Sequence, residues 1–109
     1  FGKAFEHFVI LEVRAFLSYA RKTVDMYYWR STSQFEVDLI LGDQWAIEIK
    51  GAASVADKHL KGIRALKEEG KIQNFAVVSL DQNERKTADN ITIFPWKTFL
   101  KRLWNGELV

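Results

Sequence analysis

Residues 35–50 read FEVDLILGDQWAIEIK, in which two short apolar-rich runs lie on either side of a Gly-Asp turn signal. This pattern is typical of a β-hairpin. Side chains along a strand alternate between the two faces of the sheet. The alternation predicts an apolar face of Phe35, Val37, Leu39, Leu41, Trp45, Ile47 and Ile49, and an opposite face of Glu36, Asp38, Ile40, Ala46, Glu48 and Lys50.

The length of the turn decides whether Asp38 and Glu48 meet. A two-residue turn would place Asp38 opposite Ile47 and divide the charges between the two faces. A three-residue loop, Gly42 to Gln44, places Asp38 opposite Glu48. We predict the three-residue loop, because only this register separates all the apolar groups from all the polar ones. The same register pairs Val37 with Ile49 and Leu39 with Ile47.

The predicted pairing brings two carboxylates together. Cross-strand neighbours lie about 5 Å apart, and like charges at that distance repel each other. Such a pair persists when one carboxyl group has a raised pKa or when a cation lies between them. Mg²⁺ (or Mn²⁺) is bound in this way, and Lys50 on the same face can orient a water or offset phosphate charge. Asp38, Glu48 and Lys50 therefore predict a metal-dependent phosphodiester site, although a solvated polar face is the ordinary alternative.

Composition restricts the kinds of protein. The chain has 109 residues, which predicts one domain over residues 1–109. Because it contains no Cys, disulfides, zinc-thiolate sites and cysteine nucleophiles are excluded. No apolar run long enough for a membrane span and no signal peptide is visible, so we expect a cytoplasmic protein without membrane contact. The net charge is only +2, so nucleic-acid binding would need a local basic patch.

Periodicity and turn signals predict the remaining elements. They are a helix over 2–21, a strand over 26–31, a helix over 55–69 capped by Ser54, a strand over 72–80, a loop over 81–90, a strand over 91–94 and a helix from Pro95 to Gly106. The resulting order is α-β-β-β-α-β-β-α. A hairpin, a crossover helix and further strands in this order predict an α/β fold with a central mixed β-sheet flanked by helices.

Several further residues are candidates for function, each with an ordinary alternative. Glu6 lies beside the apolar stripe of the first helix, where a carboxylate is paired or functional. Lys58, Lys61 and Arg64 form a basic helix face that is either a phosphate-contacting patch or a solvated surface. Arg30 either faces a phosphate or pairs with Glu36. We expect Trp29 and Trp45 to be core residues, and His7 and His59 not to be metal ligands.

The chain also resembles a known family. Asp38, nine intervening residues and Glu48-Ile49-Lys50 resemble the D…ExK signature of the PD-(D/E)xK nuclease superfamily. At a finer level the chain is similar to the C-terminal domain of unknown function that follows a AAA+ ATPase module in bacterial and archaeal proteins. The segments that carry this resemblance are Gly2-x-x-Phe5-Glu6, Tyr28-Trp29-Arg30-Ser31, Glu36-Val37-Asp38, Ala46 to Lys50, His59 to Leu66, Phe94-Pro95-Trp96 and Leu103-Trp104-x-Gly106.

The resemblance implies a restriction-endonuclease-like core and assigns roles. Glu6 would be the first-helix acid, Asp38 and Glu48 the metal ligands, and Lys50 the catalytic lysine. The carbonyl of Ile49 would complete the metal shell. The chain would be the C-terminal fragment of a longer ATPase, as its start at Phe1 inside a predicted helix also suggests. The helix after Lys50 lacks the Gln-x-x-x-Tyr motif of the exonuclease-like branch, which argues against a processive exonuclease.

Three hypotheses follow for the function. The first is a metal-dependent nuclease-like domain that acts on DNA, with Lys50 positioning the attacking water. The second is a non-catalytic module of the same fold that docks DNA or a partner protein onto the ATPase. The third is a structural or oligomerising tail, which exposed Trp96 and Trp104 in one apolar patch would favour.

Overall fold

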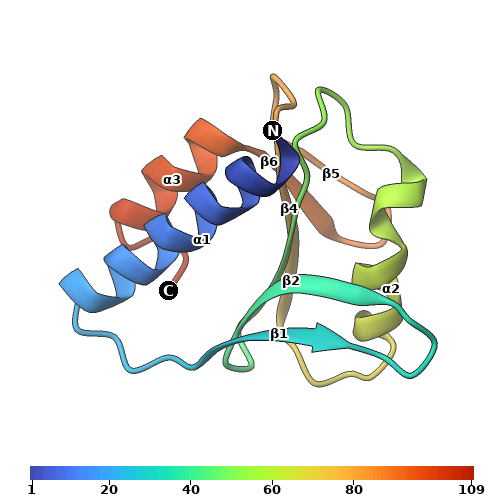
Figure 1. Cartoon of the computed structure of the whole chain (residues 1–109), viewed down its shortest axis with the longest axis horizontal. Coiled ribbons are helices and arrows are strands. Elements are labelled where there is room, and N and C mark those ends of the chain that lie inside the picture. Colours follow the sequence, from blue (N-terminus) through green and yellow to red (C-terminus); the bar gives the residue numbers. More distant parts are fainter.

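A computed structural model describes residues 1–109, in which a central β-sheet separates two helical layers (Figure 1). The helices are α1 (Gly2–Tyr19), a 3₁₀ helix η1 (Asp57–Leu60), α2 (Lys61–Lys67) and α3 (Trp96–Trp104). The strands are β1 (Met26–Arg30), β2 (Glu36–Leu41), β3 (Trp45–Ile49), β4 (Asn74–Ser79), β5 (Arg85–Lys86) and β6 (Ile91–Pro95). None of the helices combines the length and apolar character that crossing a membrane requires.

The six strands form one mixed sheet in the order β1-β2-β3-β4-β6-β5. The β1–β2, β2–β3 and β5–β6 pairs are antiparallel, whereas β3–β4 and β4–β6 are parallel. The predicted mixed sheet flanked by helices is thus confirmed. The predicted loop over residues 81–90 is wrong in one respect, because Arg85 and Lys86 pair with β6 as a short edge strand.

Both faces of the sheet are buried. On one face α1 and α3 lie side by side and cover a core that includes Val9, Leu39, Ile47 and Phe94 (Figure 1). On the other face α2 covers a second core that includes Val37, Ile40, Ala46, Leu60, Ile63 and Phe75. The expectation of a polar hairpin face is therefore wrong, since Ile40 on that face is only 1% exposed.

Between the loop and Leu39, strands β2 and β3 pair in the predicted register. On the N-terminal side of Leu39, the structure departs from the prediction. Leu39 pairs with Ile47, which confirms the three-residue loop. On the other edge of β2, Tyr27 of β1 pairs with Ile40, and Trp29 pairs with Val37. Moving two residues along β1 therefore corresponds to moving three residues along β2. The extra residue is a β-bulge at Asp38–Leu39, and a bulge reverses the alternation of side chains beyond it. Val37 consequently packs under α2 and does not join Leu39 and Ile49.

The helix ends also differ from the prediction. α1 ends at Tyr19, two residues before the predicted end at residue 21. Arg21 has a φ of 55°, and the Lys22 N–H donates to the Leu17 carbonyl, as in a Schellman motif. Pro95 closes β6, so the last helix begins one residue later than predicted, at Trp96.

The segment after the hairpin enters α2 through η1 and not through a Ser54 cap. The Ala56 N–H donates to His59 Nδ1 at 3.0 Å, which satisfies a donor at the start of η1. Val55 is tied further back, since its N–H donates to Asp81 Oδ2 at 3.1 Å. The segment that follows Lys50 is therefore attached to the end of β4.

Asp81 is the centre of this attachment, which gives a prediction. Its carboxylate also accepts a hydrogen bond from Ser79, whose side chain is fully buried, and pairs with Arg85 at 3.4 Å. Because Asp81→Ala leaves the Ser79 hydroxyl and the Val55 N–H without an acceptor, we expect a loss of about 2 kcal/mol in the free energy of unfolding. Urea denaturation measures this loss, and hydrogen exchange should show faster exchange of the Val55 amide. Asp81→Asn keeps one acceptor oxygen and should lose less; equal losses would contradict the argument.

Candidate active site

The side chains of Asp38 and Glu48 converge at the bulge. The Asp38 N–H donates to Glu48 Oε1 at 3.3 Å, and the Ile49 N–H donates to Asp38 Oδ2 at 2.8 Å. In an unbroken antiparallel ladder a main-chain carbonyl would accept from Ile49. Here the Asp38 carboxylate takes that place, which fixes its direction toward β3. The two acid side chains therefore meet beside the bulge and share one location.

Glu48 is nearly buried, with an exposed fraction of 8%. Burial, the hydrogen bond to Asp38 and the charge of Asp38 raise the pKa of Glu48 from 4.5 to about 9, and Lys50 opposes this only partly. Glu48 therefore keeps its proton at neutral pH, which limits the charge repulsion between the two carboxyl groups. A hard divalent cation is the natural replacement for that proton, because it removes the repulsion between two carboxylates.

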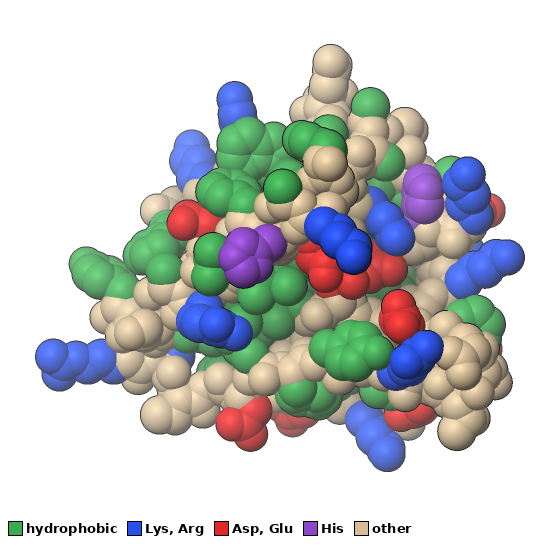
Figure 2. Space-filling model, in the orientation of Figure 1, with side chains coloured by type: hydrophobic (Ala, Val, Ile, Leu, Met, Phe, Trp, Pro, Cys, Tyr) green, Lys and Arg blue, Asp and Glu red, His purple; other side chains and the backbone are tan.

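Lys50 and Glu6 complete the polar surroundings of the pair. The Lys50 Nζ lies 3.9 Å from Glu48 Oε2, and the lysine side chain is 40% exposed. Glu6 enters from α1, and burial together with the charge of Asp38 raises its pKa. Figure 2 shows acidic side chains gathered at the centre of this face with Lys or Arg side chains directly beside them. Asp38, Glu48 and Lys50 thus adjoin one another, and Glu6 lies near enough for its charge to interact with those of Asp38 and Lys50.

The donor set fits Mg²⁺ as a two-carboxylate site. The structure contains no group of three or more His, Cys, Asp or Glu side chains arranged to hold a metal. Mg²⁺ is commonly held by one or two carboxylates, with waters and substrate phosphates as the other ligands. Asp38 and Glu48 meet this requirement. The roles of Glu6 and of the Ile49 carbonyl as additional ligands remain predictions.

Comparison with known families places the chain. A family described as "Domain of unknown function (DUF4143)" matches residues 1–99. The chain belongs to the DUF4143 family. Neither a curated protein nor a solved structure matches the chain. The family description names no activity, so the nuclease resemblance of this DUF4143 domain stays a prediction.

The four residues predicted to contact nucleic acid differ in their availability. Arg30 forms a salt bridge with Glu36 at 3.5 Å, which is the second of the two alternatives that the sequence left open for this residue. Arg64 pairs with Asp89 at 2.9 Å, and this contact lowers the pKa of the Asp89 carboxyl group to about 2. Lys58 and Lys61 are exposed and make no ion pair. The basic face formed by η1 and α2 therefore offers two free lysines, Lys58 and Lys61, to a phosphate backbone.

Trp29 and Trp45 are core residues, as predicted, and His59 has a structural contact. Trp45 packs on the core under α1 and α3, and its Nε1–H donates to the Leu108 carbonyl at 3.0 Å. Trp29 is half-buried against the core under α2. The Nδ1 of His59 is occupied by the main chain at the start of η1, and burial together with Lys50 and Lys58 lowers the pKa of His59.

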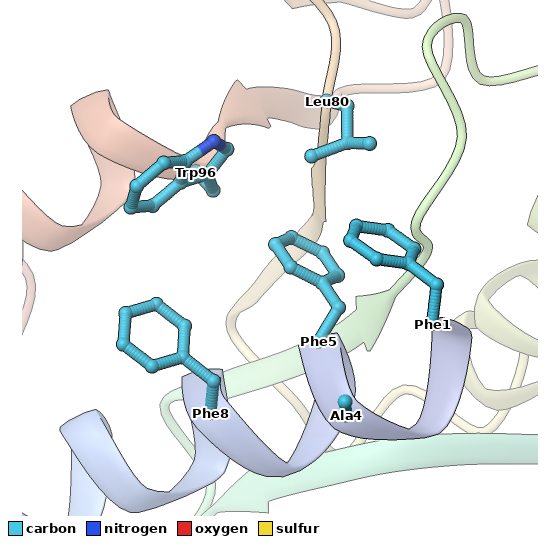
Figure 3. Close-up of a pocket in the computed structure, with 6 residues that line it drawn as sticks. All are labelled: Phe1, Ala4, Phe5, Phe8, Leu80 and Trp96. Atoms are coloured by element: carbon cyan, nitrogen blue, oxygen red, sulfur yellow. The ribbon is translucent and has the colours of Figure 1, made fainter.

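Two cavities adjoin α1, and they differ in chemistry. The larger, of about 310 Å³, lies between the side chains of Phe1, which precedes α1, and of Phe5 and Phe8 on α1, and those of Leu80 and Trp96 opposite (Figure 3). All six lining residues are hydrophobic, so this cavity contains no acid, base or nucleophile. Trp104 packs instead on Phe16 and Tyr19.

The smaller cavity, of about 190 Å³, is lined by Asp38 itself together with Arg14 and Tyr28. Arg14 is a residue that the sequence analysis did not select. Its position carries one weak signal, since Glu6, Ile10 and Arg14 follow one another at the four-residue spacing that aligns side chains on one side of a helix. The cavity therefore continues from the acid pair along α1.

Proposed function

We propose that this DUF4143 domain is a nuclease domain of the PD-(D/E)xK type, which hydrolyses phosphodiester bonds of DNA with Mg²⁺ or Mn²⁺. The observation that carries the proposal is the convergence of Asp38 and Glu48 at the bulge, with Lys50 3.9 Å from Glu48. Two adjacent carboxyl groups, one of them with a raised pKa, beside an amine have the composition expected of such a site. The mixed sheet between helical layers is compatible with a restriction-endonuclease-like core.

Each residue of the site has a separate role in the proposed hydrolysis. Asp38 and Glu48 would hold the metal ion, and Glu48 would release its proton when the cation binds. When bound, the ion neutralises phosphate charge and lowers the pKa of a coordinated water. Lys50 is partly exposed and positions the attacking water or stabilises the charge that develops on the phosphate. Glu6 adds negative charge on the α1 side.

The resemblance extends the proposal beyond the domain. By that resemblance, the DUF4143 domain acts together with an N-terminal AAA+ ATPase module of the same full-length chain, in the cytoplasm. The ATPase would supply movement along the substrate, and the domain would supply the cut. Nicking by the purified full-length protein, measured with and without ATP, tests this coupling separately from the chemistry of the domain.

Plasmid nicking in the presence of Mg²⁺ or Mn²⁺ tests the chemical proposal. Asp38→Asn removes one charge of the pair, and we expect it to reduce nicking at least about 100-fold, as losses at metal sites do. Asp43→Asn is the matched control, because Asp43 is an exposed acid at the turn of the same hairpin. Equal nicking by the wild type and Asp38→Asn would show that the acid pair does not perform the reaction.

A second candidate function is a non-catalytic module that docks DNA onto the ATPase. Two observations favour it: only two acidic ligands are assembled, and Lys58 and Lys61 are free. This function predicts binding that survives Asp38→Asn but weakens with salt and in a Lys58→Ala, Lys61→Ala double variant. A domain that binds DNA without metal-dependent nicking would support docking.

A further inference from the structure

The smaller cavity forms a cleft between α1 and the strands β1 and β2, which we name the Arg14–Tyr28 cleft. Its lining residues include Ile10, Arg14, Tyr28, Asp38 and Leu39. Asp38 belongs both to the cleft and to the acid pair, so the two are continuous. The β-bulge in β2 lies opposite Tyr28, where the register between β1 and β2 shifts. Bulges beside active sites redirect side chains, which accounts for the opening of the cleft at this point.

Arg14 gives the cleft a free positive charge. It is exposed, and it makes no ion pair with Asp38 or any other acid. By contrast Arg30, Arg64, Arg85 and Arg102 all pair with acids within the chain. A guanidinium presents several donors in a planar arrangement that matches the oxygens of a phosphate. An unpaired Arg on a wall of the cleft therefore suits a phosphate group next to the acid pair.

Tyr28 gives the cleft an aromatic surface. Its side chain is 54% exposed, and its hydroxyl group has no hydrogen-bond partner in the chain. The neighbouring Tyr27 is fixed differently, since its hydroxyl group donates to the Gly42 carbonyl at 3.1 Å. Exposed aromatic rings beside a positive charge are the usual means of binding unpaired bases, which stack on the ring.

The size of the cleft limits its occupant. At about 190 Å³ it is smaller than the pockets of about 300 Å³ or more that hold whole ligands. It therefore suits part of one nucleotide, while the rest of the strand lies along the surface. A paired base could not bring its face onto Tyr28 without leaving its partner.

We propose that the Arg14–Tyr28 cleft binds a single-stranded segment of DNA beside the scissile phosphate, with Arg14 on a neighbouring phosphate and Tyr28 stacked on an unpaired base. The position of the scissile phosphate rests on the proposed function. The cleft selects single-stranded substrate, because only an unpaired base reaches the Tyr28 ring.

Binding of a fluorescent oligothymidylate and of a duplex of equal length, with Ca²⁺ in place of Mg²⁺, tests the inference. We expect the wild type to prefer the single strand. Arg14→Ala should weaken single-strand binding about tenfold and reduce the salt slope by about 0.7, the value for one phosphate contact. Tyr28→Ala should weaken binding by about tenfold, whereas Tyr28→Phe should bind as the wild type does.

Two control variants match the two substitutions. Lys101→Ala removes one exposed charge on α3, away from the cleft, and Tyr19→Ala removes an exposed ring at the far end of α1. Both should bind as the wild type does. Equal weakening by Arg14→Ala and Lys101→Ala would overturn the inference, as would a preference for duplex that Tyr28→Ala does not change.

A parallel nicking assay separates this inference from the proposed function. If the wild type cuts DNA but Arg14→Ala and Tyr28→Ala bind and cut normally, the cleft inference fails and the nuclease proposal stands. If single-strand binding depends on Arg14 and Tyr28 but no metal-dependent cutting occurs, the cleft binds DNA and the nuclease proposal fails.

Discussion

Gly62→Ala should lower the free energy of unfolding of this domain by about 3 kcal/mol or more. Gly62 is buried in α2, where the helix crosses β2. A methyl group on its Cα would overlap the Glu36 carbonyl oxygen and lie 3.1 Å from the carbonyl carbon. Both atoms belong to the main chain of β2, so no side-chain rotation relieves the overlap. The helix must move off the sheet, and forced overpacking of this kind is costly.

Thermal unfolding measures this effect, with an expected decrease in Tm of roughly 15 °C. Gly2→Ala is the matched control, because Gly2 lies in α1 and an added methyl group there would have no neighbour within 4 Å. Alanine favours a helix over glycine, so this control should be neutral or slightly stabilising. Similar Tm values for Gly62→Ala and the wild type would show that α2 does not lie this close to β2.

The β2–β3 hairpin shows why part of the fold was predictable from the sequence and part was not. The three-residue loop and the meeting of Asp38 with Glu48 follow from the alternation of polar and apolar residues on two adjacent strands. The bulge does not, because it arises from the pairing of β2 with β1, and the polar and apolar residues in the sequence of β2 alternate through Val37, Asp38 and Leu39 without a break. The polar-face prediction failed with it, since the short sequence of α2 did not reveal that this helix buries Ile40.

Candidate site residues were predictable to different degrees for a similar reason. Asp38, Glu48 and Lys50 lie within one hairpin, so local spacing places them together. Arg14 comes from a distant helix, and only packing shows that it lines the cleft. Arg64 was predicted on the basic helix face and its side chain is 38% exposed there, but the sequence did not indicate its partner Asp89, which lies in a later turn. Contacts between elements far apart in the chain are not encoded in local pattern.

Glu48→Gln should stabilise the metal-free domain at neutral pH. The pKa of Glu48 is raised from 4.5 to about 9 in the folded chain, so the folded state keeps a proton that the unfolded chain releases above pH 4.5. Stability linked to this group is therefore fully present below pH 4.5 and is lost progressively as the pH rises toward 9. Between pH 4.5 and 7 the loss is on the order of 3 kcal/mol. A Gln amide can donate to Asp38 as the carboxyl proton does, without this loss.

Urea denaturation at several pH values in EDTA measures the difference. The wild type should lose stability between pH 5 and 8, whereas Glu48→Gln should show a shallower slope and a stability higher by up to about 3 kcal/mol at pH 7. Some slope should remain, because the pKa of Glu6 is raised as well. Glu69→Gln, which removes an exposed acid beyond α2, controls for net charge. A wild type whose stability rises from pH 5 to 8, or a Glu48→Gln variant that is less stable at pH 7, would mean that Glu48 is already ionised beside Asp38. The two carboxylates would then need a cation to remain together.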